Sequence, residues 1–565
     1  MTHSYLKTAT NRKVTPQSQP IPGSVQVENN AGGFVFEIDD WKRMERFLIL
    51  GSEGNTYYCD ERKMTADNVT CLGRCLKADG HRYLKLVEDI SVAGRAPKND
   101  PALLALAYAF AQGDVETRRE AALVLPKVAR IGTHLFHFAD FVDGMRGWGP
   151  VLCRAVADWY LGKKAGDLAS QLLKYQARDG WSHRDLLRLS HPKSDEPVIN
   201  ALFGYAVKGA EALSYGEDEP LRFVGAVEEL KRLPKPPEAS KSDEHRVVQL
   251  ITDYRLPREC VPTEWLNSKA VWEALLRGMP MTAMIRNLGK MSSIGLLAPL
   301  SSTARDVAAR LCDEAELRKA RVHPIQVLMA LATYKQGHGM KGSLNWTPVQ
   351  AVVASLDAAF YKAFLNVEPT GKRFYIALDV SGSMGDGNVA GTPLTPREAS
   401  AALVMVTMRT EEQYHIVGFT NGQYRSMWSN VTGHGSGVTD LPLNPSMDLT
   451  TAVQTVSGLN FGGTDCALPM IDAKARKIEA DVFYVLTDNE TWAGRIHPCQ
   501  ALRDYRQSTG IPAKLIVAGL TATQFSIADP SDPGSLNVVG FDASVPALIA
   551  DFVTDGKQAV QNIEA

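Results

Sequence analysis

The chain has 565 residues, of which 45% are hydrophobic and 22% charged, so it is long enough for two or three domains of an ordinary soluble protein. No apolar run approaches the ~20 residues that a membrane helix needs, and the first residues lack the apolar core of a signal peptide. The eight cysteines are sparse and irregularly spaced, which favours a reduced, cytoplasmic protein over a disulfide-stabilised secreted one. We therefore expect no membrane partner.

Charge is distributed unevenly along the chain. From Asn366 to the end, 13 Lys and Arg face 21 Asp and Glu, a net charge of −8, whereas the residues before Asn366 carry a net +6. An acidic C-terminal part joined to a basic N-terminal part predicts that a polyanion, if one is bound, meets the first part.

The N-terminal residues 1–32 contain PQSQPIPGS and NNAGG without hydrophobic periodicity, which predicts a flexible or draped arm. Residues 33–39, GFVFEID, alternate enough for one strand, which could add to a sheet elsewhere in the chain. WKRMERFLIL follows as a short amphipathic helix. We interpret Cys71 and Cys75 as small buried side chains rather than zinc ligands, because no second ligand pair accompanies them.

From about residue 65 to residue 365 the pattern is almost purely helical. Segments such as DPALLALAYAFAQG, RREAALVLPKVARI and IQVLMALATYKQG place apolar residues three and four apart, and Gly or Pro ends nearly every segment. Pairs of such segments recur roughly every 35 to 45 residues, which resembles degenerate HEAT-type repeats that stack into a curved solenoid. A compact helical bundle is the alternative, and the run of short pairs favours the solenoid.

The segment NVEPTGKR, residues 366–373, is the predicted boundary after which strands and helices alternate. FYIALDV, HIVGFT, DVFYVLTD and KLIVAGL are strand-like, YRSMWS is a weaker strand candidate, and segments such as REASAALVMVTMRT between them are helical. Alternation with continuous Val- and Ile-rich strands indicates a parallel sheet covered by helices on both faces. The predicted fold class is therefore α plus α/β.

The stretch FYIALDVSGSM carries the clearest chemical motif. It ends in a D-x-S-x-S loop, Asp379, Ser381 and Ser383, at the predicted carboxyl end of a central strand, where open α/β sheets bind ligands. Thr464 in GGTD and Asp488 in LTDNE follow in two later strand-end loops. Two carboxylates and three hydroxyls suit a divalent cation such as Mg²⁺ and leave a position for an incoming acidic group.

This set resembles the metal-ion-dependent adhesion site of von Willebrand factor A domains. The alternative is that these residues only cap helices and turns. Catalysis is not indicated: Ser381 stands where a phosphatase of the haloacid dehalogenase type has a second Asp, and neither a G-x-S-x-G elbow nor a Walker loop is present. The sequence predicts that the protein is not an enzyme.

Several dispersed strings together resemble the Ro 60 kDa autoantigen (TROVE) family along nearly the whole chain. They are RFLILGSEGNTYY, KYQARDGWSHRDLLRLSH, MTAMIRNLGKM, TYKQGHGMKG, VEPTGKRFYIALDVSGSM, FGGTDCALPMI and VLTDNETWAGRIHP. The resemblance implies a ring-shaped α-helical HEAT-repeat solenoid, residues 33–365. It also implies that a von Willebrand factor A (Rossmann-like) domain, residues 366–565, closes this ring.

The same resemblance implies an RNA-binding protein of non-coding RNA quality control that does not itself cleave RNA. Y RNAs are expected on the outer surface of the ring, and single-stranded 3′ ends of misfolded RNAs in its central hole. The resemblance further implies a monomeric protein within a ribonucleoprotein. For a bacterial relative, it implies work alongside the exoribonuclease polynucleotide phosphorylase.

In the string KYQARDGWSHRDLLRLSH, the residues Lys174, Arg178 and His191 match the positions with which the family contacts Y RNA. Lys174 and Arg178 are four apart and are expected on one helical face, and Arg184 and Arg188 repeat at the same spacing in the next helix. Two successive helices would then present cations along one edge, as proteins that follow a phosphate backbone do. The alternative is that these are ordinary solvated helix faces.

Further basic or polar residues beside glycines, expected at helix ends, are candidates for the lining of the hole: Arg286, Asn287, Lys290, Lys335, His338 and Lys341. Tyr57, Tyr58 and Trp181 could stack on unpaired bases, although buried packing is the more ordinary role. The segment 421–446 departs from the animal proteins as an insertion and is expected to reshape the rim of the metal site.

A second function class stays open beside the RNA-binding one. The protein could be an interaction scaffold, in which the metal site captures an acidic group of a partner and the solenoid binds peptides. Nucleic acid that purifies with the protein would favour the first hypothesis, and partner capture that is abolished by EDTA would favour the second.

Overall fold

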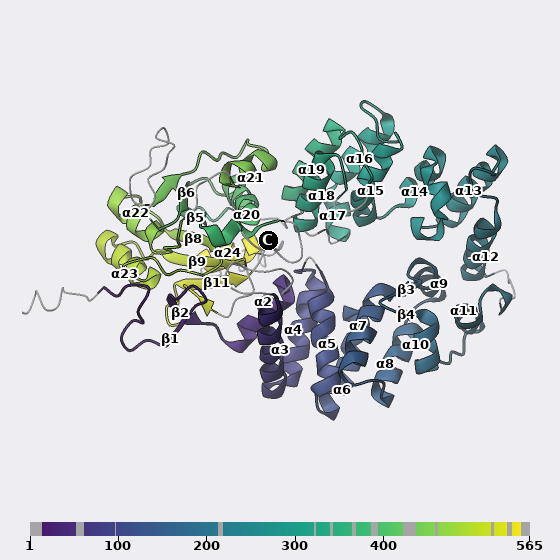
Figure 1. Ribbon diagram of the computed structural model, residues 1–565, viewed down its shortest axis with the longest axis horizontal. Helices are drawn as coiled ribbons and strands as arrows, with labels where there is room; N and C mark the ends of the chain where they lie inside the picture. Colours follow the sequence, from purple (N-terminus) through teal and green to yellow (C-terminus); the bar gives the residue numbers. More distant parts are fainter. Residues whose placement is uncertain are drawn as a thin grey trace, which may run out of the picture. The chain divides into compact units, whose positions relative to one another are not determined.

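The computed structural model divides the chain into two compact units (Figure 1). One unit is Leu72–Ala363, and the other combines Met1–Cys71 with Phe364–Ala565. The first has a net charge of +7 and the second a net charge of −9. The structure describes residues 14–51, 61–96, 98–212, 218–320, 322, 324–339, 343–363, 369–385, 394–421, 437–457, 462–520, 525–539 and 545–554.

The unit Leu72–Ala363 is built from stacked helices. After α3 (Glu61–Ala78), which crosses the boundary between the units, its α-helices are α4 (Gly80–Ala93), α5 (Asp100–Gln112), α6 (Val115–Val128), α7 (Gly132–Met145), α8 (Pro150–Leu161), α9 (Ala165–Lys174), α10 (His183–Ser190), α11 (Pro197–Lys208), α12 (Glu219–Arg232), α13 (Lys241–Tyr254), α14 (Lys269–Gly278), α15 (Met281–Ser293), α16 (Ser302–Leu311), α17 (Glu314–Lys319), α18 (Pro324–Gln336) and α19 (Gln350–Lys362).

The packing of these helices follows chain order. The helix α4 packs against α6, α6 against α8 and α8 against α10, while α5 packs against α7. Helices two apart in the chain therefore stack in layers, and α18 and α16 pack against α19 in the same local manner. This confirms the stacked helix pairs expected from the sequence and argues against a single compact bundle.

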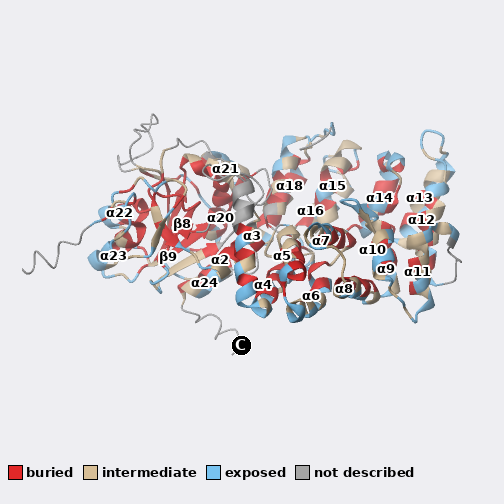
Figure 2. Cartoon of the chain, turned by 60° about the horizontal axis from the view of Figure 1, so that its bottom comes forward, coloured by how far each residue is buried: buried red, intermediate tan, exposed pale blue. Residues whose placement is uncertain are grey.

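Local sequence signals begin and end these helices. The Asp79 side chain accepts a hydrogen bond from the Arg82 amide at the start of α4, and Gly94 adopts a φ of 70° just after its end. Buried residues concentrate where helices face one another (Figure 2). Cys71 and Cys75 are both buried, as expected. Among the described residues, no helix has the length and apolar character needed to cross a membrane.

The second unit contains a six-stranded sheet with the strand order β11-β9-β8-β5-β6-β7 among the described residues. The strands are β5 (Phe374–Asp379), β6 (Tyr414–Phe419), β7 (Val438–Asp440), β8 (Val482–Thr487), β9 (Lys514–Gly519) and β11 (Ser535–Val539). All neighbours are parallel except β6 and β7. The predicted wholly parallel sheet is therefore wrong at one edge: the segment 421–446 supplies an antiparallel strand there. The weaker strand candidate YRSMWS lies outside the described residues.

Helices cover both faces of this sheet, as the sequence indicated. The helices α22 (Leu468–Arg476) and α23 (Pro498–Thr509) pack on the face that contains Tyr375, Phe483 and Val517. Alternate residues such as Ile376 are buried on the other face, and α20 (Pro396–Thr410) packs against β5. The unit also contains the helices α21 (Leu449–Ser457) and α24 (Val545–Val553).

The N-terminal segment belongs to this compact α/β unit, which includes residues 1–71. The strand β2 (Phe34–Glu37) pairs with both β1 (Gln26–Glu28) and β10 (Phe525–Ser526) in an antiparallel sheet, which confirms the predicted addition of this strand to a sheet elsewhere. The helix α2 (Asp40–Leu50) packs near β11, and its fully buried Arg46 donates hydrogen bonds to Phe525 O (2.9 Å) and Asn537 Oδ1 (2.6 Å).

Candidate metal centre and basic surface

The topology of the sheet places two acidic residues side by side. From β5 the chain proceeds to β6 on one side and later returns to add β8 on the other side of β5. Such a switch point opens a crevice at the carboxyl ends of the two strands, where α/β proteins bind ligands. Asp379 is the last residue of β5 and Asp488 follows β8 directly, so both lie at this point.

The D-x-S-x-S loop is tightly folded around the carboxylate of Asp379. The Ser381 amide donates to Asp379 Oδ1 at 3.0 Å, Thr487 Oγ1 donates to Asp379 Oδ2 at 2.7 Å, and the hydroxyls of Ser381 and Ser383 are 3.1 Å apart. Arg397 of α20 donates to the Ser381 carbonyl oxygen at 2.7 Å. All these side chains are buried, so their orientations are fixed by hydrogen bonds rather than left to solvent.

The hydroxyl of Thr464 is a candidate ligand for a cation. Its side chain is fully buried, and its hydroxyl oxygen has no hydrogen-bond partner among the described residues. An unpaired buried hydroxyl costs about 1–3 kcal/mol unless another ligand satisfies it. Its loop is held by the Trp492 and Ala493 amides, which donate to Thr464 O at 3.1 and 3.0 Å, and by Gly382 N, which donates to Gly462 O at 3.4 Å.

The electrostatics of the Asp379 and Asp488 carboxylates also favour a bound cation. Burial raises the pKa of Asp379, and burial together with the negative charge of Asp379 raises the pKa of Asp488 to about 7. A cation between the two would relieve both the desolvation and the repulsion. No group of three or more His, Cys, Asp or Glu in the described part of the chain is placed to hold a metal, so this site would depend on its hydroxyls.

The residues Asp379, Ser381, Ser383, Thr464 and Asp488 therefore fit a hard divalent cation such as Mg²⁺. Carboxylate and hydroxyl oxygens are the donors that this ion prefers. The chemistry that a bound cation supplies is Lewis acidity toward an oxygen ligand, most simply a carboxylate.

The backbone conformation of the predicted basic surface differs from the one expected from the sequence. The helix α9 ends at Lys174, and Arg178 lies on the short strand β3 (Ala177–Arg178), which pairs with β4 (Trp181–Ser182). The prediction that Lys174 and Arg178 share a helical face is therefore wrong. The physical reason is the turn: Asp179 and Gly180 both have positive φ, 52° and 81°, as a two-residue Asp-Gly hairpin requires.

The second predicted helix is confirmed. The helix α10 begins with a capping box between Ser182 and Asp185 and ends before His191, which has a φ of 45°. Arg184 and Arg188 are both exposed and, being four apart, share one face of α10. His191 is exposed at the end of this helix.

The hairpin is anchored to α7 and to the loop that follows this helix. His137 Nδ1 of α7 lies 2.6 Å from Asp179 Oδ2, and the rings of Trp148 and Trp181 are 5.4 Å apart. Trp181 is half-buried and pairs across the hairpin with Arg178, whose side chain is 61% exposed. A cation and an aromatic ring therefore stand together at an accessible edge, which suits a phosphate and a base.

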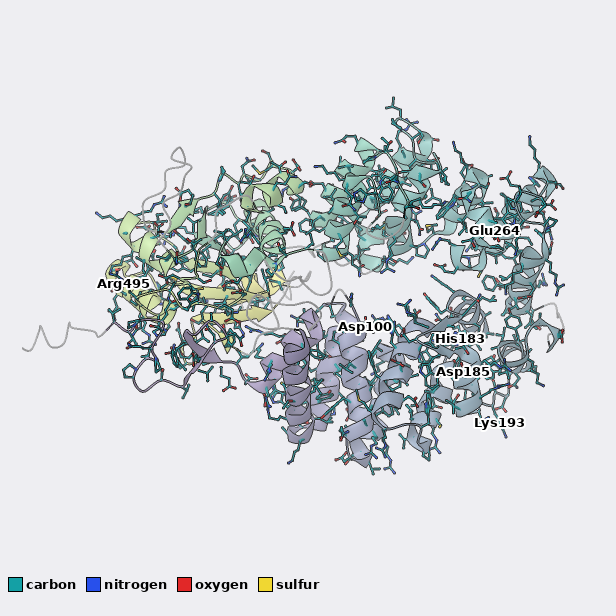
Figure 3. All side chains as sticks on the ribbon, viewed as in Figure 1. Asp100, His183, Asp185, Lys193, Glu264 and Arg495 are labelled. Atoms are coloured by element: carbon teal, nitrogen blue, oxygen red, sulfur yellow. The ribbon has the colours of Figure 1, made fainter. Side chains whose placement is uncertain are left out.

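His183, the first residue of α10, is held in place by contacts with neighbouring helices. Its Nδ1 lies 2.8 Å from the hydroxyl of Tyr160, and its Nε2 lies 3.2 Å from Gln171 O. Burial lowers the pKa of His183 to about 4, so the ring is neutral near pH 7. Figure 3 shows His183 and Asp185 at the start of α10 and Lys193 beyond its other end.

Sequence reasoning missed His137, Asp179, Trp148 and His183. The Asp-Gly pair was a local signal for the hairpin that could have been used, whereas the partners of these side chains lie too far away in the chain to be inferred from local spacing.

The structure places some, but not all, of the candidate hole-lining residues at helix ends, as the sequence predicted. Arg286 and Asn287 lie in the middle of α15 rather than at a helix end, although Arg286 is exposed. Lys290 in the last turn of α15 donates to Asn267 Oδ1 at 2.8 Å. Burial and the charge of Arg258 lower the pKa of Lys290. Exposed Lys335 lies in the last turn of α18 and His338 follows it, whereas Lys341, Tyr57 and Tyr58 lie outside the described residues.

Comparison with known proteins decides the family. Residues 373–553 match the family model of the Ro60 vWA domain, and residues 27–257 and 255–333 match that of the TROVE domain. The chain belongs to the Ro60 family. This confirms the resemblance found in the dispersed sequence strings.

The sequence similarity to relatives in the Ro60 family extends over nearly the full length of the chain. The chain is 40% identical to the RNA-binding protein RO60 of Deinococcus radiodurans over 547 residues, covering 96% of this chain and 98% of that protein. It is 37% identical to the RNA-binding protein RO60 of Caenorhabditis elegans over 602 residues, covering 94% and 90%. The crystal structure of the Deinococcus radiodurans RO (RSR) protein matches with a TM-score of 0.68 and 39% identity, covering 92% of this chain and 100% of that one.

The Ro60-family domains do not coincide with the compact units. The TROVE match begins at residue 27, yet residues 27–71 belong to the same compact unit as the vWA domain. The α/β unit is therefore completed by a segment from the other family domain.

Proposed function

We propose that this protein binds RNA without cleaving it and acts in the quality control of non-coding RNA. The observation that carries the proposal is the group of accessible cations around the β3–β4 hairpin and α10. Lys174, Arg178, Arg184, Arg188 and His191 come within one stretch of chain on a unit with a net charge of +7.

The chemistry of this surface supports the proposal. Phosphates bind cations with little regard to base sequence, and an exposed Arg178 beside the half-buried ring of Trp181 offers both a phosphate contact and a stacking surface. Membership in a family whose relatives are named RNA-binding protein RO60 supports the same ligand class.

We further propose which RNAs are bound and where. Structured Y RNAs occupy the outer surface around Lys174, Arg178 and His191. Single-stranded 3′ ends of misfolded RNAs enter a central hole of the solenoid lined by Arg286, Lys290, Lys335 and Lys341. The protein then acts as a cytoplasmic monomer within a ribonucleoprotein, alongside an exoribonuclease such as polynucleotide phosphorylase.

We also propose that the α/β unit binds Mg²⁺ through the five oxygen-bearing residues at the β5–β8 switch point. The buried Thr464 hydroxyl, which has no hydrogen-bond partner in the part of the chain that the structure describes, is the observation that favours this second activity. A carboxylate of a partner protein would complete the coordination, so the α/β unit recruits protein while the helical unit binds RNA.

Sequencing RNA crosslinked to the protein in its own cell tests the main proposal. Enrichment of structured non-coding RNAs, together with filter binding that weakens steeply as salt rises, is the expected result. Crosslinks no more frequent than those of an unrelated acidic protein would contradict it. So would an RNA-cleaving activity that purifies with the chain and is lost on a point substitution.

A further inference from the structure

The N-terminal strap, which we define as residues 14–33, lies against the loops of the candidate metal centre. The strap and these loops belong to the same compact unit. The sequence predicted only a flexible or draped arm here, yet Thr15, Gln17 and Asn29 are buried. Gly33 allows the closest approach, because a Cβ atom at this position would lie 1.9 Å from the Thr491 carbonyl oxygen.

Gln17 uses its whole hydrogen-bonding capacity on these loops. Its side chain is 0% exposed, and its Nε2 donates to Asp465 Oδ1 at 2.7 Å and to Ile496 O at 2.9 Å. Its Oε1 accepts hydrogen bonds from Thr491 Oγ1 at 2.5 Å and Gly494 N at 3.2 Å. A primary amide donates two hydrogen bonds and accepts two, so every position is filled.

The far end of the strap holds the same region through a carboxylate. Asn30 Nδ2 donates to Glu490 Oε1 at 2.8 Å, and the Ala31 amide donates to Glu490 Oε2 at 3.2 Å. Asn29 Nδ2 donates to Thr491 O at 2.8 Å. These contacts join residues about 460 positions apart in the chain.

The partners of the strap are immediate neighbours of two predicted cation ligands. Asp465 follows Thr464 directly, and Glu490 lies two residues after Asp488. Gln17 is therefore a single side chain that joins the loop of one ligand to the loop of the other.

We propose that the N-terminal strap positions the Thr464 and Asp488 loops, so that the affinity of the site for a divalent cation depends on the strap. This inference rests on the metal site proposed above. Groups that hold metal ligands in place typically change metal affinity by about 10- to 100-fold when they are removed. Gln17 is a positioning residue in this scheme and does not itself contact the cation.

The test is isothermal titration of the full-length protein with Mn²⁺, comparing Gln17→Ala with wild type. We expect the Kd to rise by about 10- to 100-fold. Gln19→Ala is the matched control, because the Gln19 side chain is exposed on the same strap, and its Kd should stay unchanged. Asp379→Ala should abolish binding. Hydrogen exchange of residues 462–467 and 488–496 without metal should quicken in Gln17→Ala and stay as in wild type in Gln19→Ala.

A milder variant guards against unfolding of Gln17→Ala. Asn30→Ala removes one hydrogen bond at a half-buried position, and we expect a several-fold rise in Kd with an unchanged melting temperature of the α/β unit. If Gln17→Ala and Asn30→Ala both bind Mn²⁺ as wild type does while Asp379→Ala does not, the positioning role is overturned and the metal site stands. If wild type binds no Mn²⁺, the metal site itself is refuted and this inference with it.

Discussion

Replacing Lys174 and Arg178 together with Ala should weaken RNA binding by an amount that the salt dependence reveals. Each phosphate contact on duplex RNA releases close to one counterion, which is worth about 1 kcal/mol at 150 mM salt. Losing both contacts should therefore cost about 2 kcal/mol, or roughly 30-fold in Kd. The slope of log K against log salt should fall by about 1.8. The fold should persist, because Lys174 is only half-buried at the end of α9 and the Arg178 side chain is 61% exposed.

The assay is filter binding of a structured non-coding RNA between 50 and 200 mM salt. Over this interval, the affinity of a protein that makes many phosphate contacts falls by about 10³- to 10⁵-fold. Arg119→Ala serves as the control, because Arg119 is an exposed cation on α6 of the same unit. A double variant that keeps both the affinity and the slope of wild type would refute the assignment of RNA to this surface. A loss of about 1 kcal/mol in Arg119→Ala, half that of the double variant for half the charge removed, would show that only net charge matters.

Four further predictions follow from the structure. Asp179→Asn keeps the positive φ of the hairpin turn but removes the charge 3.6 Å from Arg178, so RNA affinity should rise a few-fold in the same filter assay. Trp181→Ala should cost about 1–3 kcal/mol of affinity for single-stranded RNA, measured by fluorescence anisotropy, if a base stacks there. Mg²⁺ should raise the melting temperature of wild type, and neither Mg²⁺ nor EDTA should change that of Asp379→Ala. Burial lowers the pKa of His183 from 6.5 to about 4, so the unfolded chain takes up the proton first as the pH falls. The free energy of unfolding should therefore fall between pH 6.5 and pH 4, by about 2 kcal/mol at pH 5. Urea unfolding should show this loss in wild type and not in His183→Asn.

The candidate metal centre follows from the sequence because each of its signals is local. Asp379, Ser381 and Ser383 lie within five residues, and strand-like runs before Asp379 and Asp488 place both at carboxyl ends of parallel strands. The sheet topology then brings such ends together without further information. Helix periodicity likewise determined the stacked pairs of the other unit, since each pair buries its apolar stripe against a neighbour in the chain.

The basic surface shows that predicted site residues can be presented by another backbone conformation than the one expected. Helical spacing between Lys174 and Arg178 was a weaker signal than the Asp179-Gly180 pair between Arg178 and Trp181, because positive φ at two successive positions ends any helix. The residues stay candidates, but they are presented by a hairpin, and His137 holds its turn from another helix.

The sequence by itself determined the two kinds of structure, the five candidate oxygen ligands and the cluster of cations, because these depend on neighbours within a few residues. Only the tertiary structure decided that residues 14–33 complete the α/β unit. The hydrogen bonds of Gln17 join residues more than 440 positions away, and no local periodicity encodes such a partner. A buried amide is specified by the groups that surround it in space, and those groups are assembled only when the chain folds.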